Sequence, residues 1–309
     1  MKIAVVGCGA MGSVYAALLG AAGHEVWAID TWREHVEAIR RNGLRLEGAS
    51  GECTARVHAT TDAAEAGVCD LVIIATKVMH VEAAAQSTRS LLGPDTPVLS
   101  IQNGLGGPDA AARVLGRGRV MVGVVGGFGA SIRAPGRAHH NGCDLVRLGE
   151  LAGQLTPRLE KVAEVWRSGG FEVKCFGDID QLVWEKLVCN ACFSGTCAIA
   201  ERSIIEVLDD PYAWEVASGC ATEAYTVARA KGIRLDIDDP VAYVRDFGLK
   251  IPNARPSMLL DHMAGRMSEI DAINGAIPVA ARAVGVEAPL NTVVSALVRA
   301  KEHRMGVRK

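Results

Sequence analysis

The chain opens with a glycine-rich turn between an apolar strand and a helix. Residues 3–6 form a short apolar run that predicts a buried strand, and residues 13–22 predict a helix. The glycines between them suit a tight turn, a close approach of backbone N–H groups to a phosphate, and close packing of helix on strand. The positive end of that helix then faces the anion. We therefore expect a dinucleotide to bind through Gly7, Gly9, Ala10, Met11 and Gly12.

An acidic residue stands 18 residues beyond Gly12, where a ribose-binding carboxylate is expected. It is Asp30, which ends a second β-prone run at residues 24–29. A carboxylate accepts hydrogen bonds from both ribose hydroxyls of NAD and repels the 2′-phosphate of NADP. We expect NAD(H), with NADP(H) as the alternative if Arg33 serves a phosphate. Asp30 has a second interpretation, as the cap of a helix that begins near Trp32.

The overall composition favours small-molecule chemistry. A chain of 309 residues with 49% hydrophobic residues is long enough for two domains. Its net charge of -2 and its dispersed basic residues predict binding neither to nucleic acid nor to a membrane surface. It contains no apolar run of bilayer-spanning length and no signal-peptide pattern, so we expect a cytoplasmic protein.

The cysteines are scattered through apolar surroundings, which predicts reduced, buried thiols rather than disulfides. Cys189, Cys192 and Cys197 lack a suitably spaced histidine or further cysteine, so we expect no metal there. The nine cysteines are Cys8, Cys53, Cys69, Cys143, Cys175, Cys189, Cys192, Cys197 and Cys220.

Strand-like and helix-like segments alternate over the first half of the chain. Continuous apolar runs at residues 70–75 and 97–101 are followed by helical patterns at residues 81–92 and 109–115. This alternation is typical of an α/β protein with a Rossmann-type, doubly wound parallel sheet. Further strands are predicted as a hairpin of residues 44–46 with 55–59, and as antiparallel or mixed strands over residues 120–148.

Helical periodicity replaces this alternation beyond about residue 177. We expect a dinucleotide-binding domain at residues 1–178 and an all-helical C-terminal domain, for substrate binding and dimerisation, at residues 179–309. Substrate is expected between the domains, at the carboxyl ends of the strands. The predicted helices of the second domain cover residues 182–200, 213–231, 257–284 and 291–303.

Polar residues follow two of the predicted parallel strands. Lys77 comes after one strand and Asn103 after the next, so both face the dinucleotide crevice. The amide of Asn103 suits the nicotinamide ribose or a substrate oxygen, and Lys77 supplies a positive charge beside either. The alternative for Asn103 is ordinary turn chemistry, because Asn-Gly is a common turn signal.

A narrow polar stripe crosses the apolar helix predicted at residues 182–200. Lys186, Asn190 and Ser194 recur at every fourth position of this helix. Apolar neighbours on both sides indicate that the stripe lines a cleft. A partly desolvated lysine has a depressed pKa and gives a proton to a developing alkoxide. The alternative is a surface lysine beside a buried amide.

Two further polar residues stand on the predicted helix at residues 257–284. Ser257 is placed as its N-cap, and a helix start is also a seat for a substrate carboxylate. Glu269 follows on the same helical segment. Its alternative is an ordinary solvated charge.

Several ordered blocks resemble the ketopantoate reductase (2-dehydropantoate 2-reductase) family over nearly the whole chain. They are the glycine turn, Thr76-Lys77, Gln102–Gly104, Trp184–Asn190, Pro256–Asp261 and Glu269–Gly275. The resemblance implies Lys186 as general acid, and Asn103 and Asn190 as holders of the substrate's carbonyl and hydroxyl groups. It further implies that Ser257 binds the substrate carboxylate, that Glu269 completes the substrate site, and that Lys77 lies beside cofactor and substrate. It also suggests a homodimer.

Two positions depart from the family pattern. Ser194-Gly195 stands where asparagine and proline are typical, and the shorter hydroxyl leaves room for a different substrate. Asp30 stands where many members have a basic or neutral residue that accepts NADPH. Members similar to D-mandelate dehydrogenase instead use NAD and oxidise bulky D-2-hydroxy acids.

We therefore expect an oxidoreductase similar to ketopantoate reductase, which transfers hydride between a nicotinamide cofactor and C2 of a 2-oxo or 2-hydroxy acid. One alternative is an NAD-dependent D-2-hydroxy acid dehydrogenase of the D-mandelate type. Another is a noncatalytic NAD(H)-binding regulator, which needs the glycines and Asp30 but not Lys186, Asn190, Ser257 or Glu269.

Overall fold

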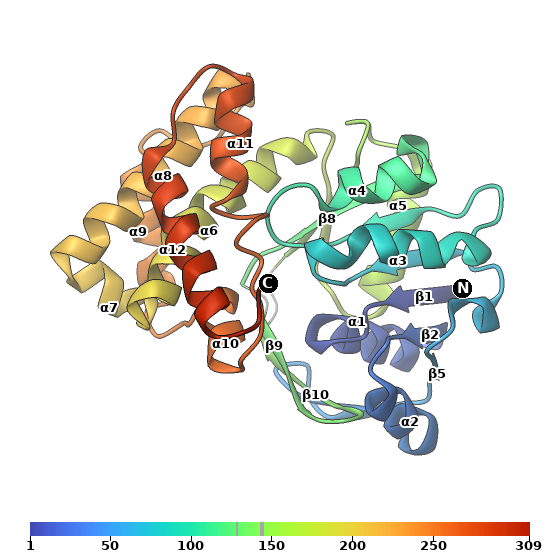
Figure 1. Ribbon diagram of the computed structural model, residues 1–309. Coiled ribbons are helices and arrows are strands. Elements are labelled where there is room, and N and C mark those ends of the chain that lie inside the picture. Colours follow the sequence, from blue (N-terminus) through green and yellow to red (C-terminus); the bar gives the residue numbers. More distant parts are fainter. Residues whose placement is uncertain (128, 143–144) are drawn as a thin grey trace. The chain divides into compact units, whose positions relative to one another are not determined.

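The structure is a computed structural model that describes residues 1–127, 129–142 and 145–309. Its contacts divide the chain into two compact units. One unit comprises Met1–Gln102 and Gly106–Ile179, and the other comprises Asn103–Leu105 and Asp180–Lys309. Each unit is shown in Figure 1, coloured along the sequence.

The first unit contains an eight-stranded sheet. Its strands are β1 (Lys2–Val6), β2 (Glu25–Ile29), β5 (His58–Thr60), β6 (Leu71–Ile74), β7 (Val98–Ser100), β8 (Val120–Val125), β11 (Val146–Glu150) and β12 (Val173–Cys175). Their order is β12-β11-β8-β7-β6-β1-β2-β5. The strands from β5 to β8 in that order run parallel, whereas β11 runs antiparallel to β8.

The strand order reverses beside β1, and this confirms the predicted doubly wound sheet. From β1 the chain continues to β2 and β5 on one side and then returns to β6 on the other. The carboxyl ends of β1 and β6 therefore flank a switch point, where open α/β sheets bind ligands. Ala75 continues this pairing, because its N–H donates to the Val6 carbonyl at 2.8 Å.

Helices cover both faces of this sheet. They are α1 (Ala10–Ala21), α2 (Arg33–Asn42), α3 (Val81–Ser87), α4 (Gly107–Leu115) and α5 (Pro157–Ser168), with short 3-10 helices η1 (Ala63–Ala66), η2 (Val78–His80), η3 (Thr88–Leu91) and η4 (Arg117–Arg119). Ile3 and Val5 of β1 join one core with residues of α1 and α5. Ala4 and Val6 join a second core with residues of α3 and α4. The strand is buried on both faces, as its continuous apolar run predicts.

A smaller sheet packs against α1. It contains β4 (Cys53–Ala55), β3 (Leu44–Gly48), β10 (Arg137–Gly142) and β9 (Gly129–Ala134), in that order. The predicted hairpin is therefore wrong in its second strand, because β3 pairs with β4 and residues 58–60 form β5 beside β2. Ala59 and Thr60 are buried in the main sheet, so the chain changes sheets at residues 56–57.

The second unit is helical, as predicted. Its helices are α6 (Ile179–Ala200), α7 (Ile204–Asp209), α8 (Pro211–Ala230), α9 (Pro240–Lys250), α10 (Ser257–Met263), α11 (Ala276–Ala283) and α12 (Pro289–Arg304). The single helix predicted at residues 257–284 is wrong. Gly265 has a φ of +65°, which ends α10, and a series of turns leads to α11. None of the described helices is long and apolar enough to cross a membrane.

Candidate functional site

Close backbone approaches explain two glycines of the N-terminal turn. A Cβ on Gly7, where φ is +88°, would lie 2.6 Å from the backbone nitrogen of Thr76. A Cβ on Gly12 would lie 2.1 Å from the Gly7 carbonyl oxygen. Around Gly9, by contrast, a Cβ would meet no atom of the described residues within 4 Å. The turn is thus tightly packed on its inner side and open at Gly9.

The start of α1 presents backbone N–H groups for which no acceptor is found among the described residues. Gly9 is the N-cap without a side-chain cap hydrogen bond, and the first turn of α1 contains no acidic residue. The first helical hydrogen bond runs from the Ser13 N–H to the Gly9 carbonyl, at 2.8 Å. The N–H groups before Ser13 have no carbonyl of the same helix to which they can donate. These N–H groups belong to Ala10, Met11 and Gly12. The turn and the helix start together fit the pyrophosphate of a dinucleotide.

Asp30 directly follows β2 and keeps one carboxylate oxygen available. Its Oδ1 accepts the Trp32 N–H at 2.9 Å, which shapes the turn into α2. The N-cap of α2 is Trp32, so Asp30 is not the cap itself. For Oδ2 no hydrogen bond is found within the described ranges of the chain. This half-buried carboxylate fits the ribose of a dinucleotide.

The end of β6 adds a hydroxyl to which the sequence analysis gave no role of its own. The Thr76 Oγ1 is buried and has no hydrogen-bond partner in the described part of the chain. A buried hydroxyl of this kind is suited to a hydrogen bond with a bound ligand. Lys77, half-buried, is the N-cap of η2. The neighbouring strand is tied to β6 because Gln102 Nε2 donates to the Ile74 carbonyl at 2.5 Å.

In the helical unit, one hydrogen bond joins two predicted site residues. Lys186 Nζ on α6 donates to Asn103 Oδ1 at 2.7 Å, and both residues are half-buried. An ammonium has three donors, so it can bind more than one acceptor at the same time. Asn103 thus belongs to a charged, hydrogen-bonded pair rather than to a turn alone.

A close backbone contact places Asn103 in this unit. Gly104 has a φ of +78°, and a Cβ there would lie 2.2 Å from the Ala272 carbonyl oxygen. The next residue, Leu105, donates its N–H to that same carbonyl at 2.8 Å. Residues 103–105 therefore pack against and hydrogen-bond to the segment that contains Glu269. Glycine is required at position 104 by both conformation and space.

The other members of the polar stripe also lie on α6. Asn190 is half-buried, whereas Ser194 is only 4% exposed. Gly195 allows close packing here, because a Cβ would lie 2.4 Å from Val294 Cγ1. Asn274 fastens the neighbouring segment to the same helix, since its Nδ2 donates to the Ala191 carbonyl at 2.8 Å.

Ser257 and Glu269 take different positions from those predicted. Ser257 is the first residue of α10 and Pro256 is its N-cap, so the prediction of Ser257 as N-cap is wrong. The extended backbone of Pro256 already forms the boundary, and Ser257 is exposed. Glu269 is half-buried in the turns between α10 and α11. Its own carbonyl accepts the Ala272 N–H at 3.0 Å, which begins the next turn.

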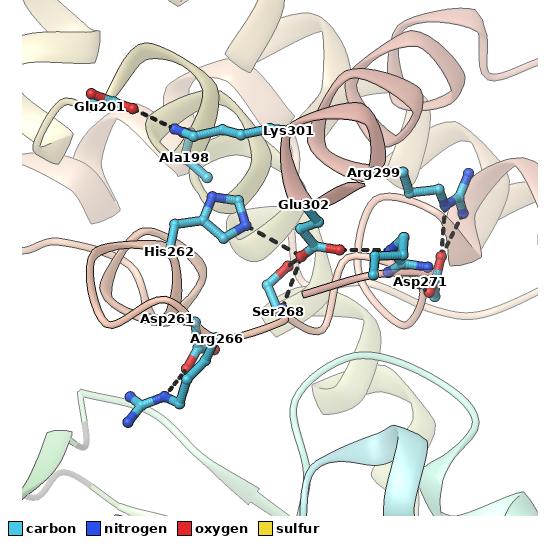
Figure 2. Close-up of polar contacts among 11 residues, drawn as sticks. Ala198, Glu201, Asp261, His262, Arg266, Ser268, Asp271, Arg299, Lys301 and Glu302 are labelled. Atoms are coloured by element: carbon cyan, nitrogen blue, oxygen red, sulfur yellow. Dashed lines mark hydrogen bonds and ion pairs between the residues drawn. The ribbon is translucent and has the colours of Figure 1, made fainter. Parts of the chain in front are cut away.

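A buried carboxylate that sequence reasoning missed holds the segment before Glu269 (Figure 2). Glu302 on α12 is 0% exposed, and its Oε1 accepts from the Ser268 N–H at 2.8 Å and the Ser268 hydroxyl at 2.6 Å. The same oxygen lies 3.2 Å from His262 Nε2 of α10, and Oε2 accepts from Arg308 at 2.7 Å. Although burial opposes it, hydrogen bonding from Ser268 and Arg308 lowers the pKa of Glu302.

The described cysteines are free thiols. Burial raises the pKa of Cys189 and of Cys197 to about 12 in each case, so these thiols are protonated at neutral pH. Among residues 1–127, 129–142 and 145–309, no group of histidine, cysteine and acidic residues is arranged to hold a metal. The prediction for Cys143 falls outside the described residues.

Comparison with known proteins covers both units. The family described as ketopantoate reductase PanE/ApbA matches residues 3–153, and its C-terminal part matches residues 178–302. A 2-dehydropantoate 2-reductase of Pyrococcus horikoshii is 32% identical over 302 residues, which are 98% of each chain.

Two solved structures are similar over nearly the full length. A PanE/ApbA family ketopantoate reductase from Ralstonia eutropha JMP134 has a TM-score of 0.91 at 30% identity, covering 99% of this chain and 100% of that chain. D-mandelate dehydrogenase, solved with NADH and anilino(oxo)acetate, also has a TM-score of 0.91 at 30% identity, covering 100% of both chains.

Proposed function

Because this chain belongs to the ketopantoate reductase family of nicotinamide-dependent oxidoreductases, we propose that Lys186 handles the proton in reduction of a 2-oxo acid at C2. The observation that carries this proposal is the 2.7 Å hydrogen bond from Lys186 Nζ to Asn103 Oδ1. It holds a charged amine in a half-buried setting, where it acts more strongly on a developing alkoxide than in bulk water.

The chain's residues divide the work on the substrate. The Lys186 ammonium donates a hydrogen bond to the carbonyl oxygen at C2 and then transfers its proton to the alkoxide. Asn103 orients that ammonium, and Asn190 donates its amide to a substrate oxygen. Ser257 binds the carboxylate through its hydroxyl, Glu269 completes the substrate site, and Ser194 leaves space for the side chain of the acid.

The cofactor site is proposed in the first unit. When bound, a nicotinamide cofactor supplies or accepts the hydride. Backbone N–H groups of Gly9, Ala10, Met11 and Gly12 bind the pyrophosphate. Gly7 shapes the turn of this site, because its own N–H donates to the Ile29 carbonyl at 2.9 Å. Asp30 accepts from the ribose hydroxyls. Lys77 and Asn103, which follow β6 and β7 in the sequence, complete the set of residues proposed for the cofactor.

We propose NAD(H) rather than NADP(H) because a carboxylate at position 30 repels a 2′-phosphate. Turnover with NADH and NADPH is compared in the wild type and in Asp30→Asn. The wild type is expected to prefer NADH, and the neutral variant is expected to shift the ratio of kcat/KM values towards NADPH by about tenfold, equal to about 1.4 kcal/mol. An NADPH preference of the wild type would refute the assignment.

The substrate is tested with a panel of 2-oxo acids that includes ketopantoate and phenylglyoxylate, followed by oxidation of the matching 2-hydroxy acids. We expect NADH oxidation with at least one 2-oxo acid. A preference for phenylglyoxylate over ketopantoate would favour a dehydrogenase of the D-mandelate type. This is the second candidate because of the similar NADH-bound structure and because of Ser194. Tight NADH binding without turnover of any acid would support a noncatalytic regulator.

We further propose a homodimer in the cytoplasm. Three apolar residues on one side of α12 are exposed: Leu290, Val293 and Leu297, of which Val293 is 55% and Leu297 is 51% exposed. Exposed apolar faces of this kind are commonly buried by a second copy. Light scattering during size-exclusion chromatography measures the mass directly, and a monomer at micromolar concentration would contradict the proposal.

A further inference from the structure

A buried serine holds the backbone carbonyl that precedes Gly9. The Ser13 hydroxyl donates to the Cys8 carbonyl oxygen at 3.0 Å, and Ser13 is 0% exposed. A hydroxyl has one hydrogen to donate, so this bond uses the only donor of Ser13's side chain. The serine lies on α1, one residue after the last glycine of the turn.

A histidine on α2 fixes the direction of that hydrogen. The Gly136 N–H donates to His35 Nδ1 at 3.1 Å, so Nδ1 carries no proton and the neutral ring carries its proton on Nε2. Nε2 lies 3.2 Å from Ser13 Oγ and donates to it, which leaves the hydroxyl hydrogen for Cys8. Burial lowers the pKa of the His35 imidazole, and the negative charge of Asp30 raises it by less. The net pKa is therefore lowered, and the ring is neutral at pH 7.

The contacts of His35 restrain its ring from several sides. The Trp32 ring stacks on it, with centroids 5.0 Å apart and planes inclined by 14°. Gly136, in the turn between β9 and β10, approaches α2 so closely that a Cβ would lie 3.0 Å from the Cβ of Ala38. The small sheet is thereby connected through His35 and Ser13 to the glycine turn.

The geometry of the peptide unit then determines where the Gly9 N–H points. The Cys8 carbonyl and the Gly9 N–H belong to one trans peptide unit, so they point in opposite directions. The carbonyl points at buried Ser13, and therefore the N–H points away from it. No acceptor for this N–H is found within the described ranges, and the space at Gly9 is open.

From this arrangement we infer that Ser13 and His35 are positioning residues that aim the Gly9 N–H at the pyrophosphate of the cofactor. Neither side chain touches the dinucleotide. Their effect is to preorganise one donor, so that its orientation is fixed before the anion binds. The inference rests on the proposed cofactor site and adds residues that the glycine motif does not contain.

The test compares Ser13→Ala with a matched control, Thr88→Val. Thr88 is also 0% exposed, and its hydroxyl donates to the Ala85 carbonyl at 2.8 Å, away from the glycine turn. The Kd of NADH, or of NADPH if the wild type binds it more tightly, is measured by nicotinamide fluorescence. The Kd of adenosine, which has no phosphate, is measured by competition, and thermal unfolding shows that each variant is folded.

Ser13→Ala is expected to raise the Kd of the dinucleotide about fivefold, as loss of one hydrogen bond predicts, and to leave the Kd of adenosine unchanged. Thr88→Val is expected to change neither. Equal effects of both variants on the dinucleotide, or an equal effect of Ser13→Ala on both ligands, would overturn the inference. A wild type that binds neither dinucleotide would instead overturn the cofactor site itself.

A double variant tests whether the two side chains act in series. His35→Gln removes the imidazole acceptor of the Gly136 N–H, so it is expected to raise the Kd of the dinucleotide by itself. Because His35 acts through the Ser13 hydroxyl, adding His35→Gln to Ser13→Ala is expected to cause no further change. Effects on Kd that multiply in the double variant would show two independent structural changes and would overturn the inference.

Discussion

A lysine and an asparagine from distant parts of the sequence share the hydrogen bond on which the proposed chemistry depends. Sequence patterns singled out both residues, Asn103 from its place after a strand and Lys186 from the stripe on its helix. Neither pattern showed that they meet at 2.7 Å. Their pairing depends on the backbone contact of Gly104 with Ala272, which no local pattern encodes.

Replacement of Lys186 by alanine is expected to lower kcat by about 10² or more, because the proton donor is lost. The measurement is steady-state kinetics with the best 2-oxo acid found. Lys231→Ala is the control, since Lys231 is an exposed lysine of the same unit, at the end of α8. A kcat of Lys186→Ala close to that of the control would remove Lys186 from the role of acid.

At the scale of elements, the structure has two helices, α10 and α11, where the apolar periodicity predicts one. Apolar spacing continues through residues 257–284, yet Gly265 adopts a positive φ and the next residues form turns. Polar partners from α12 stabilise those turns, because Glu302 accepts two hydrogen bonds from Ser268. Periodicity measures which face is apolar and does not detect such a partner.

Glu302→Gln is expected to destabilise the protein by about 3 kcal/mol, because a neutral amide cannot satisfy the donors around this buried oxygen pair. Its control is Glu201→Gln, also in Figure 2, which removes the 2.7 Å ion pair between Lys301 and an exposed carboxylate and is expected to destabilise the protein much less. Urea unfolding of both variants measures the difference. Equal losses would show that burial of Glu302 adds nothing.

The difference in stability between the wild type and Glu302→Gln is expected to depend on pH, because the Glu302 carboxylate titrates. Its pKa is lowered from the usual 4.5 in the folded protein, so its contribution to stability is present above pH 4.5. The contribution is lost as the pH falls through the lower, folded-state pKa. The stability of the wild type is therefore expected to approach that of Glu302→Gln below pH 4.5, and a constant difference across this range would contradict the expectation.

Gly104→Ala is expected to lower kcat at least about tenfold, because the added Cβ would lie 2.2 Å from the Ala272 carbonyl and displace Asn103. Gly106→Ala is the matched control. Its φ of +92° is equally unfavourable for alanine, but a Cβ there would meet no described atom within 4 Å. Both variants incur a backbone cost of about 1 kcal/mol, so equal kcat values would show that the contact with Ala272 does not position Asn103.

At the scale of the whole molecule, alternation of strands and helices was enough to predict a doubly wound sheet followed by helices. It was insufficient for the second sheet, where residues 53–55 pair with β3 and residues 58–60 return to the main sheet. Both segments are short and β-prone, so their local sequences do not distinguish one partner strand from another. The two helices α7 and α9 were also absent from the prediction.

A cofactor that binds only the folded chain raises the temperature of unfolding. At a concentration 100 times its Kd, NADH is expected to add about 2.7 kcal/mol, which corresponds to a rise in Tm of about 4 °C. Differential scanning calorimetry measures it, with nicotinamide alone as the control because it lacks the pyrophosphate. An unchanged Tm with both NADH and NADPH would contradict dinucleotide binding.

The sequence by itself determined the class of fold, the glycine turn with Asp30 after the next strand, and the residues proposed for catalysis. These depend on local spacing and on steric limits that act within a few residues. Only the tertiary structure decided that Lys186 meets Asn103, that Ser257 begins its helix instead of capping it, and that Glu302 holds Ser268. Contacts between distant segments depend on how whole elements pack, and packing is selected by the combined burial of many side chains rather than by any single motif.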